Sequence, residues 1–204
     1  TSMASIAPNY QLPSLSRLIR LSLSGQIDTE EVLLELQQQY NSFVKNFGRQ
    51  PDFIDGHHHV HQLPIIRDAV INLIKINWSG KLPWIRVAWE SPIRLILRRE
   101  SIIRAIGIGF FGLGLKFRAR SNGIQYNRGF TGVYNYNKET LNDVLMDKFL
   151  TKADDGTLMF CHPGIVDAHL VKVDRLITPR EHEYMFFNSD NFTAALNRNG
   201  FTLV

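Results

Sequence analysis

Short apolar segments alternate with helical patterns along this chain, and this alternation limits the possible folds more than any other feature of the sequence. Between the apolar segments, apolar residues recur at helical spacing, as in 65–74 and 141–149. Strands that are separated by helices pair in parallel, and the helices pack against the sheet. The sequence therefore predicts an α/β fold, with strands expected at residues 53–61, 84–89, 129–134 and 157–164.

The clearest helical signal follows Asp28. This residue predicts an N-cap, Glu31 completes a capping box, and Gly48 ends the helix. The apolar stripe of this helix is Val32, Leu36, Tyr40, Phe43, Val44 and Phe47. Further helices are expected at 15–23, 65–74, 93–117, 180–187 and 191–199, and one that begins at Asn137 or Thr140.

Residues 107–112, Gly-Ile-Gly-Phe-Phe-Gly, match the dinucleotide-binding fingerprint letter for letter. That fingerprint has physical meaning only between a strand and a helix, and no strand is expected before residue 107. We therefore expect these glycines to be small residues at helix contacts.

Composition indicates a globular protein. The 204 residues are 44% hydrophobic and 21% charged, which suits one domain over residues 1–204. The single cysteine, Cys161, excludes an internal disulfide and fits a reducing compartment. The sequence contains no signal-peptide pattern and no apolar run of membrane-spanning length, so we expect a cytoplasmic protein that does not bind a membrane.

The net charge of +4 is concentrated in one part of the chain. A basic patch of this kind suits nucleic acid or an anionic surface, but no nucleic-acid motif accompanies it. We expect a solvated helix face and no nucleic-acid partner. The residues concerned are Arg94, Arg98, Arg99, Arg104, Lys116, Arg118 and Arg120.

Residues 53–61 contain four histidines and an aspartate. If the segment is a strand, Asp55, His57, His59 and His61 point to one face, because side chains alternate. Neutral imidazole is the commonest metal ligand, and a nearby carboxylate can bind the metal or orient an imidazole. The pattern favours a divalent metal site. The alternative is a surface tract, or a set of hydrogen-bonded core histidines.

His162 is the second chemical candidate, because an apolar strand would deliver it to a loop. It is either a catalytic histidine or a hydrogen-bonded loop residue. Two arginines are candidate substrate contacts: Arg86 and Arg180 would hold a substrate hydroxyl or acetate, or pair with Glu90 and Glu183.

Three motifs resemble the YdjC-like carbohydrate deacetylases, a family that includes chito-oligosaccharide deacetylase. They are Pro-Asp-Phe-Ile-Asp-Gly-His-His-His-Val-His at 51–61 with Leu63-Pro64, Phe-Cys-His-Pro-Gly at 160–164, and Arg180 with Glu183 before a helix ending at Gly200-Phe201. The resemblance runs from about residue 15 to the end. It implies a distorted, TIM-like (β/α) barrel that binds a divalent metal, magnesium or zinc, and hydrolyses the acetamido group of an N-acetylated sugar.

The resemblance also implies residue roles. His57 would be a metal ligand and His162 the catalytic acid, both at the mouth of the barrel. Asp55, His59 and His61 would be second-shell groups or sugar contacts, as would Arg86 and Arg180. Three aromatic residues would either stack on a sugar ring or belong to the core, namely Trp89, Phe130 and Tyr134.

Two motifs of the family are absent from this sequence. Family members open with a strand carrying Asp-Asp-Phe-Gly and later have a Gly-Leu-His-like strand, and neither occurs here. The chain thus resembles the C-terminal two thirds of the family fold, with a barrel incomplete at the N-terminus. Such a barrel leaves sheet edges and apolar faces unpaired, which predicts a homodimer.

Two alternatives to a deacetylase remain open. The first is a non-catalytic or truncated relative that keeps the fold and binds carbohydrate without turnover, which the missing aspartates favour. The second is a metal-dependent hydrolase of another bond, such as a phosphoester, to which the basic residues would attract an anion.

Overall fold

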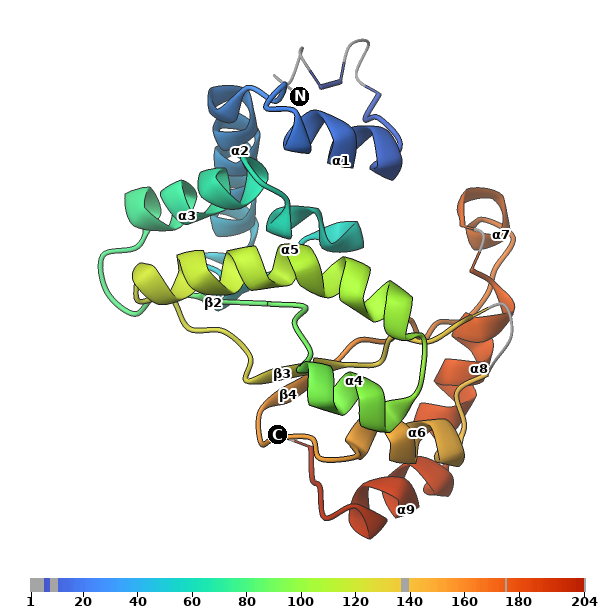
Figure 1. The fold of residues 1–204 in the computed structure, drawn as a ribbon. Helices are drawn as coiled ribbons and strands as arrows, with labels where there is room; N and C mark the ends of the chain where they lie inside the picture. Colours follow the sequence, from blue (N-terminus) through green and yellow to red (C-terminus); the bar gives the residue numbers. More distant parts are fainter. Residues whose placement is uncertain (1–5, 8–10, 137–139, 175, 204) are drawn as a thin grey trace. The chain divides into compact units, whose positions relative to one another are not determined.

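The computed structural model describes residues 6–7, 11–136, 140–174 and 176–203 (Figure 1). In chain order the elements are α1 (Leu15–Leu23), α2 (Thr29–Phe47), β1 (Phe53–Ile54), the 3₁₀ helix η2 (His57–Gln62), α3 (Ile66–Asn77), β2 (Trp84–Ile85), α4 (Pro92–Arg98), α5 (Ile102–Ser121), β3 (Gly129–Thr131), α6 (Asp143–Leu150), β4 (Thr157–Met159), α7 (Leu170–Val173), α8 (Thr178–Phe187) and α9 (Asp190–Arg198).

The chain divides into two compact units. Unit 1 consists of Thr1–Trp89 and Ile108–Asn127, and unit 2 of Glu90–Gly107 and Arg128–Val204. The boundary passes through α5. One domain over residues 1–204 stays a prediction.

Unit 1 has a parallel strand pair and an apolar core around α3. Phe53 of β1 lies opposite Trp84 of β2. Helical spacing places one side of α3 in the core, where it meets the C-terminal half of α5. The buried residues of α3 are Ile66, Ala69, Val70, Ile71, Leu73 and Ile74. The prediction for the 65–74 helix differs in two residues, since it included Ile65 and omitted Ile71.

The start and end of α2 follow the sequence signals. The Asp28 carboxylate accepts hydrogen bonds from the backbone N–H groups of Glu30 and Glu31, at 2.8 and 3.3 Å. Gly48 adopts the left-handed conformation (φ 67°) that ends the helix. The helix packs on α3 by its inner side, while Phe47, expected in the apolar stripe, is exposed.

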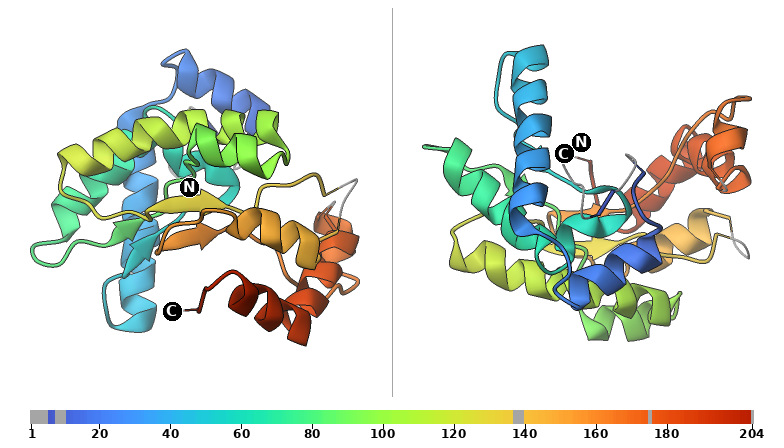
Figure 2. Two further views of the ribbon diagram at one scale, coloured as in Figure 1. Left: turned by 60° about the horizontal axis from the view of Figure 1, so that its bottom comes forward. Right: turned by 90° about the horizontal axis from the view of Figure 1, so that it is seen from above.

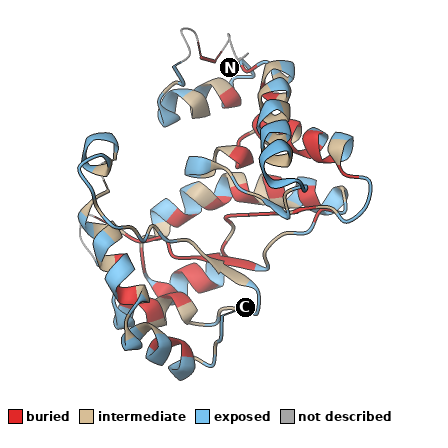
Figure 3. Ribbon diagram, turned by 180° about the vertical axis from the view of Figure 1, so that it is seen from behind, coloured by how far each residue is buried: buried red, intermediate tan, exposed pale blue. Residues whose placement is uncertain are grey.

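Unit 2 has its own strand pair and core. Strands β3 and β4 run parallel, with Phe130 opposite Leu158 (Figure 2, left). The core joins α6, α8 and α9, and buried residues are red in Figure 3. Its buried members are Tyr134, Tyr136, Leu141, Leu145, Met146, Phe149, Phe186, Ala195 and Leu196.

The predicted α/β class and the parallel pairing are confirmed, but the described strands form two separate pairs. A barrel is not seen among them and stays a prediction. The strands are also shorter than expected. After Ile85, the backbone N–H groups of Val87 and Ala88 donate to the side chains of Asn127 and Gln62, both at 2.7 Å. Because side chains satisfy this backbone, it forms no ladder with another strand.

The helix expected at 93–117 is two helices. Ser91 Oγ accepts from the Arg94 N–H at the start of α4, and Arg99 and Ser101 have φ values of 54° and 43° between α4 and α5. Positive φ cannot continue a right-handed helix, so the break lies there.

The glycines at 107–112 lie inside α5, as predicted when the dinucleotide-binding motif was rejected. A Cβ on Gly112 would lie 2.8 Å from the Ala88 carbonyl oxygen, so this glycine permits a close helix contact. The helices at 15–23, 180–187 and 191–199 are confirmed within two residues at each end. A start at Asn137 lies outside the described residues, and α6 begins at Asp143 with Asn142 as its cap.

The predicted solvated basic face is wrong for two of its arginines. Arg94 and Arg98 are buried, because both face the buried carboxylate of Glu90. Arg98 donates to Glu90 Oε2 at 2.9 Å and to the Val133 carbonyl oxygen at 2.6 Å. None of the helices in the described part of the chain is both long and apolar enough to cross a membrane.

Candidate functional site

The histidine segment of unit 1 is not a strand. Strand β1 ends at Ile54, and η2 begins at His57. His58 and His59 have φ values of 52° and 60°, so the backbone turns instead of extending. The predicted common face of Asp55, His57, His59 and His61 is therefore wrong, because the two-residue alternation requires an extended chain.

The Arg86 side chain contacts three residues of the histidine segment. Its side chain is 6% exposed. Nε donates to Asp55 Oδ1 at 2.7 Å, one terminal nitrogen donates to the Gly56 carbonyl oxygen at 3.1 Å, and the other lies 2.5 Å from His59 Nδ1. A guanidinium only donates, so His59 Nδ1 is the acceptor and its proton resides on Nε2. Arg86 thus holds the segment through these three contacts, and its predicted substrate contact stays a prediction.

His61 is a buried, hydrogen-bonded histidine. Its Nε2 donates to the Arg86 carbonyl oxygen at 2.7 Å. Burial lowers its pKa from 6.5 to about 4, so the ring is neutral near pH 7. A Cβ on Gly56 would lie 2.6 Å from His61 Nδ1, so only glycine leaves room for this ring. These contacts match the alternative of a hydrogen-bonded core histidine, and a role of His61 as a second-shell group or sugar contact stays a prediction.

His57 is exposed, and its ring meets the edge of the His58 ring at a centroid distance of 4.1 Å. Within the described residues, no group of three or more His, Cys, Asp or Glu side chains could hold a metal ion. The nearby donors are engaged elsewhere: Asp55 and His59 bind Arg86, and His61 is buried. The described residues therefore do not complete a metal site around His57.

In unit 2, His162 lies in the loop that follows β4. Its backbone N–H donates a short hydrogen bond to Glu183 Oε2. Glu183 Oε1 accepts from the Tyr134 hydroxyl at 2.7 Å. The imidazole is half-buried and packs edge-on against Phe160 and Tyr136, at centroid distances of 4.3 and 5.1 Å.

Arg180 contacts the same loop from the first turn of α8. Its guanidinium donates to the His162 carbonyl oxygen at 3.4 Å and to Asp174 at 2.5 Å. Its own carbonyl oxygen accepts from the Gly164 N–H at 3.1 Å. Arg180 thus binds the loop and Asp174, and its predicted substrate contact stays a prediction.

Glu183 and Tyr134 form a buried acid–phenol pair. Burial raises the pKa of Glu183 above its ordinary value, although the His162 N–H and the Tyr134 hydroxyl act in the other direction. Burial also raises the pKa of Tyr134, which keeps it the donor. The sequence predicted Glu183 as part of a motif or as a partner of Arg180, and Tyr134 as a stacking or core residue, but not that the two pair. The three-residue spacing of Arg180 and Glu183 could have indicated a shared helix face.

The aromatic candidates divide between core and partial exposure. Phe130 and Tyr134 are buried, which confirms the core alternative for both, and Trp89 is half-buried.

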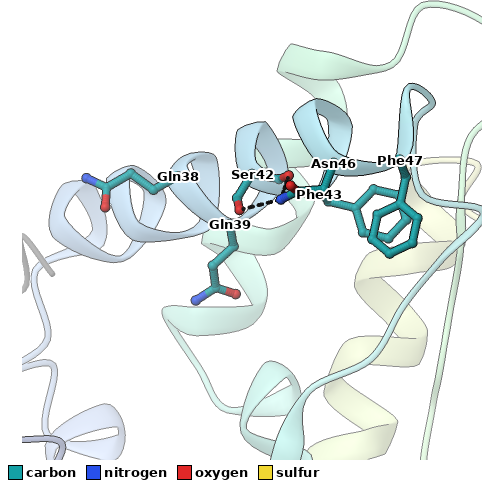
Figure 4. A pocket seen from close by; sticks show the side chains of 6 residues that line it. All are labelled: Gln38, Gln39, Ser42, Phe43, Asn46 and Phe47. Atoms are coloured by element: carbon teal, nitrogen blue, oxygen red, sulfur yellow. Dashed lines mark hydrogen bonds between the residues drawn. The ribbon is translucent and has the colours of Figure 1, made fainter.

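A surface hollow of about 470 Å³ lies on α2. All of its lining residues belong to this one helix, and none is a predicted site residue. Figure 4 shows Phe43 and Phe47 side by side, with ring centroids 4.5 Å apart, while Gln38 and Gln39 point in different directions. One helix face lacks converging polar groups, so this hollow does not identify a site.

His57 belongs to unit 1 and His162 to unit 2. Their convergence on one metal ion, and their roles as ligand and acid, stay predictions.

Residues 1–198 match the family model described as "YdjC-like protein". The chain is also similar to proteins named chitooligosaccharide deacetylase. It is 26% identical to that of Escherichia fergusonii over 96% of this chain and 71% of the relative. With the protein of Serratia marcescens the identity is 28%, over 91% of this chain and 64% of the relative. With that of Yersinia enterocolitica it is 25%, over 88% of this chain and 61% of the relative.

These alignments leave out about a third of each relative, so the chain spans only part of the proteins it matches. The family match nevertheless covers nearly all of the chain, including both histidine-containing segments. This chain belongs to the YdjC-like protein family.

Proposed function

We propose that this protein removes acetyl groups from N-acetylated sugars or oligosaccharides, and that His162 is the general acid of the reaction. The observation that carries the proposal is the similarity to chitooligosaccharide deacetylases over 88–96% of the chain. The fixed position of His162 in unit 2 supports its role.

Amide hydrolysis requires a proton for the leaving nitrogen. Water adds to the acetyl carbonyl carbon, the C–N bond breaks, and acetate and a free sugar amine are formed. An amide anion is a very poor leaving group, so a positioned acid that protonates the nitrogen typically accelerates the reaction about 10²- to 10⁴-fold. Imidazole carries such a proton near neutral pH. His162 is half-exposed, whereas His61 is buried, so His162 is the better placed of the two to meet a substrate.

A divalent metal would polarise the acetyl carbonyl and activate the water. Because the described residues do not complete a metal site, we assign no step to a metal. Magnesium or zinc with His57 as one ligand stays a prediction, as do the barrel and the homodimer.

The test is acetate release from N-acetylated chito-oligosaccharides by the purified full-length protein. We expect His162→Ala to reduce kcat by about 10²- to 10⁴-fold. The matched control is His169→Ala, an exposed histidine of the same unit, which should leave kcat unchanged. No acetate release by the wild type, or equal losses in both variants, would contradict the proposal.

The second candidate is a relative that binds carbohydrate without turnover. It is favoured by the lack of a three-donor metal cluster among the residues that the structure describes. Calorimetry with the same oligosaccharides, together with acetate and metal analysis in added Mg²⁺ or Zn²⁺, separates the two. Binding without acetate release supports the second candidate, and acetate release rejects it.

A further inference from the structure

The loop around His162 is held by polar contacts more than by apolar packing. Strand β4 ends three residues earlier, at Met159. Cys161 and Pro163 are exposed, and Ile165 is 73% exposed. Exposed side chains fix a loop weakly by burial, so beside the contacts of the His162 ring with Phe160 and Tyr136, the hydrogen bonds of the backbone hold His162 in place.

Two charged side chains bind the two backbone groups of His162. Glu183 accepts the N–H, and Arg180 donates to the carbonyl oxygen. The Arg180 carbonyl oxygen also accepts from Gly164, two residues further along the loop. The bond to Glu183 is short and the bond to Arg180 is long, so Glu183 restrains the loop more strongly and Arg180 adds a weaker second contact.

Both side chains are themselves held in place. Glu183 is 0% exposed and receives the Tyr134 hydroxyl. Arg180 binds Asp174 through two of its nitrogens, at 2.5 and 3.2 Å. Both residues lie on α8, three positions apart and therefore on one face of the helix.

We propose that Arg180 and Glu183 are positioning residues for His162, which they hold by its backbone so that its imidazole meets the substrate in one fixed place. This inference rests on the proposed function, because it gives the Arg180/Glu183 motif a role in placing the general acid. In this role both residues act through the backbone of His162, and Tyr134 acts through Glu183.

The first experiment is a double-mutant cycle on acetate release. In Glu183→Gln an amide nitrogen replaces one of the two carboxylate oxygens, so one of the bonds to His162 and Tyr134 is lost, and kcat should fall about 10- to 100-fold with KM unchanged. In a His162→Ala background, Glu183→Gln should cause no further loss, because the group that it positions is gone. The control Glu181→Gln makes the same change at an exposed site of α8 and should leave kcat unchanged. Losses that multiply, or an unchanged kcat in Glu183→Gln, would overturn the inference.

Arg180→Lys gives a second variant should Glu183→Gln fail to fold. Lysine lacks the planar fork that bridges Asp174 and the His162 carbonyl, so kcat should fall while the thermal midpoint changes little. Arg198→Lys, at an exposed ion pair with Asp147, is the control. Equal kcat values for the two variants would argue against positioning.

A spectroscopic measurement separates this inference from the proposed function. In protein labelled with ¹⁵N-histidine, the His162 amide proton should resonate downfield because a carboxylate accepts it, and Glu183→Gln should move it upfield. This shift is expected whether or not acetate is released. A His162 amide that does not respond overturns the inference, while a responding amide in a protein that releases no acetate overturns only the proposed function.

Discussion

Arg86 Nε donates a 2.7 Å hydrogen bond to Asp55 Oδ1 across 31 residues of sequence. The bond joins the end of β2 to the start of the histidine segment. Since the same guanidinium contacts His59 and the Gly56 carbonyl, one buried side chain sets the course of the backbone between β1 and η2.

The first prediction concerns the loss of this arginine. Arg86→Ala should lower the free energy of unfolding by about 3 kcal/mol, because it leaves several polar partners without a donor. Asp55→Asn should cost no more than about 1 kcal/mol, because Asp55 is 45% exposed and water replaces part of the interaction. Urea unfolding measures both. Arg118→Ala, at an exposed pair with Asp68, should cost less than about 1 kcal/mol. Equal effects of the Arg86 and Arg118 variants would refute the role given to Arg86.

The second prediction is a pH dependence that comes from His61. Its folded pKa of about 4 lies below the unfolded value of 6.5, so the unfolded state binds more protons between these values. The contribution of His61 is complete above pH 6.5 and is lost as the pH falls toward 4. Between pH 7.5 and 5 the loss should be about 2 kcal/mol.

The contribution of His61 is measured as the difference in the pH dependence of unfolding between the wild type and a His61 variant. Burial raises the pKa values of Glu90 and Glu183, which act in the opposite direction, so the raw slope is mixed. Unfolding of His61→Gln should change less between pH 7.5 and 5 than that of the wild type, by about 2 kcal/mol. His169→Gln, an exposed control, should keep the wild-type slope. A wild-type slope in His61→Gln would show that this ring does not titrate as described.

The third prediction concerns Gly132, at the end of β3. It has φ 96°, and a Cβ there would lie 2.1 Å from the Phe160 carbonyl oxygen. Gly132→Ala should therefore cost more than the roughly 1–2 kcal/mol of left-handed backbone, since β3 and β4 must also move apart. Gly200 has φ 74° and open space where a Cβ would lie, so Gly200→Ala should lose only the stability that the left-handed backbone costs. Thermal unfolding of the two variants measures the difference, and equal midpoints would exclude the close approach.

The fourth prediction concerns the buried ion pair of unit 2. Burial raises the pKa of Glu90 and lowers that of Arg98, because it disfavours the charged form of both, and each is the other's counter-ion at 2.9 Å. Glu90→Ala should cost about 3–5 kcal/mol because it leaves a buried guanidinium uncompensated. Denaturant unfolding should show this loss, with Glu181→Ala as the exposed control. A small loss would mean that water reaches Arg98.

Local signals in the sequence predicted local structure well. The cap at Asp28, the stop at Gly48 and the apolar spacing of α3 each depend on neighbours within a turn or two, and all were confirmed. The family resemblance was confirmed too. The strand read from 53–61 was wrong, because alternation of side chains assumes an extended backbone and Arg86, far along the chain, holds this one turned.

The sequence by itself determined most of the helices, the parallel pairing and the family, since these follow from residue spacing and motif. Only the tertiary structure decided what the charged residues do. The sequence left Arg86 and Arg180 open between substrate contacts and partners of nearby glutamates, and the fold shows that each binds backbone from a distant segment. In the sequence, a side chain that makes a long-range hydrogen bond cannot be told from one that contacts a ligand, because the tertiary fold determines which partner lies next to it.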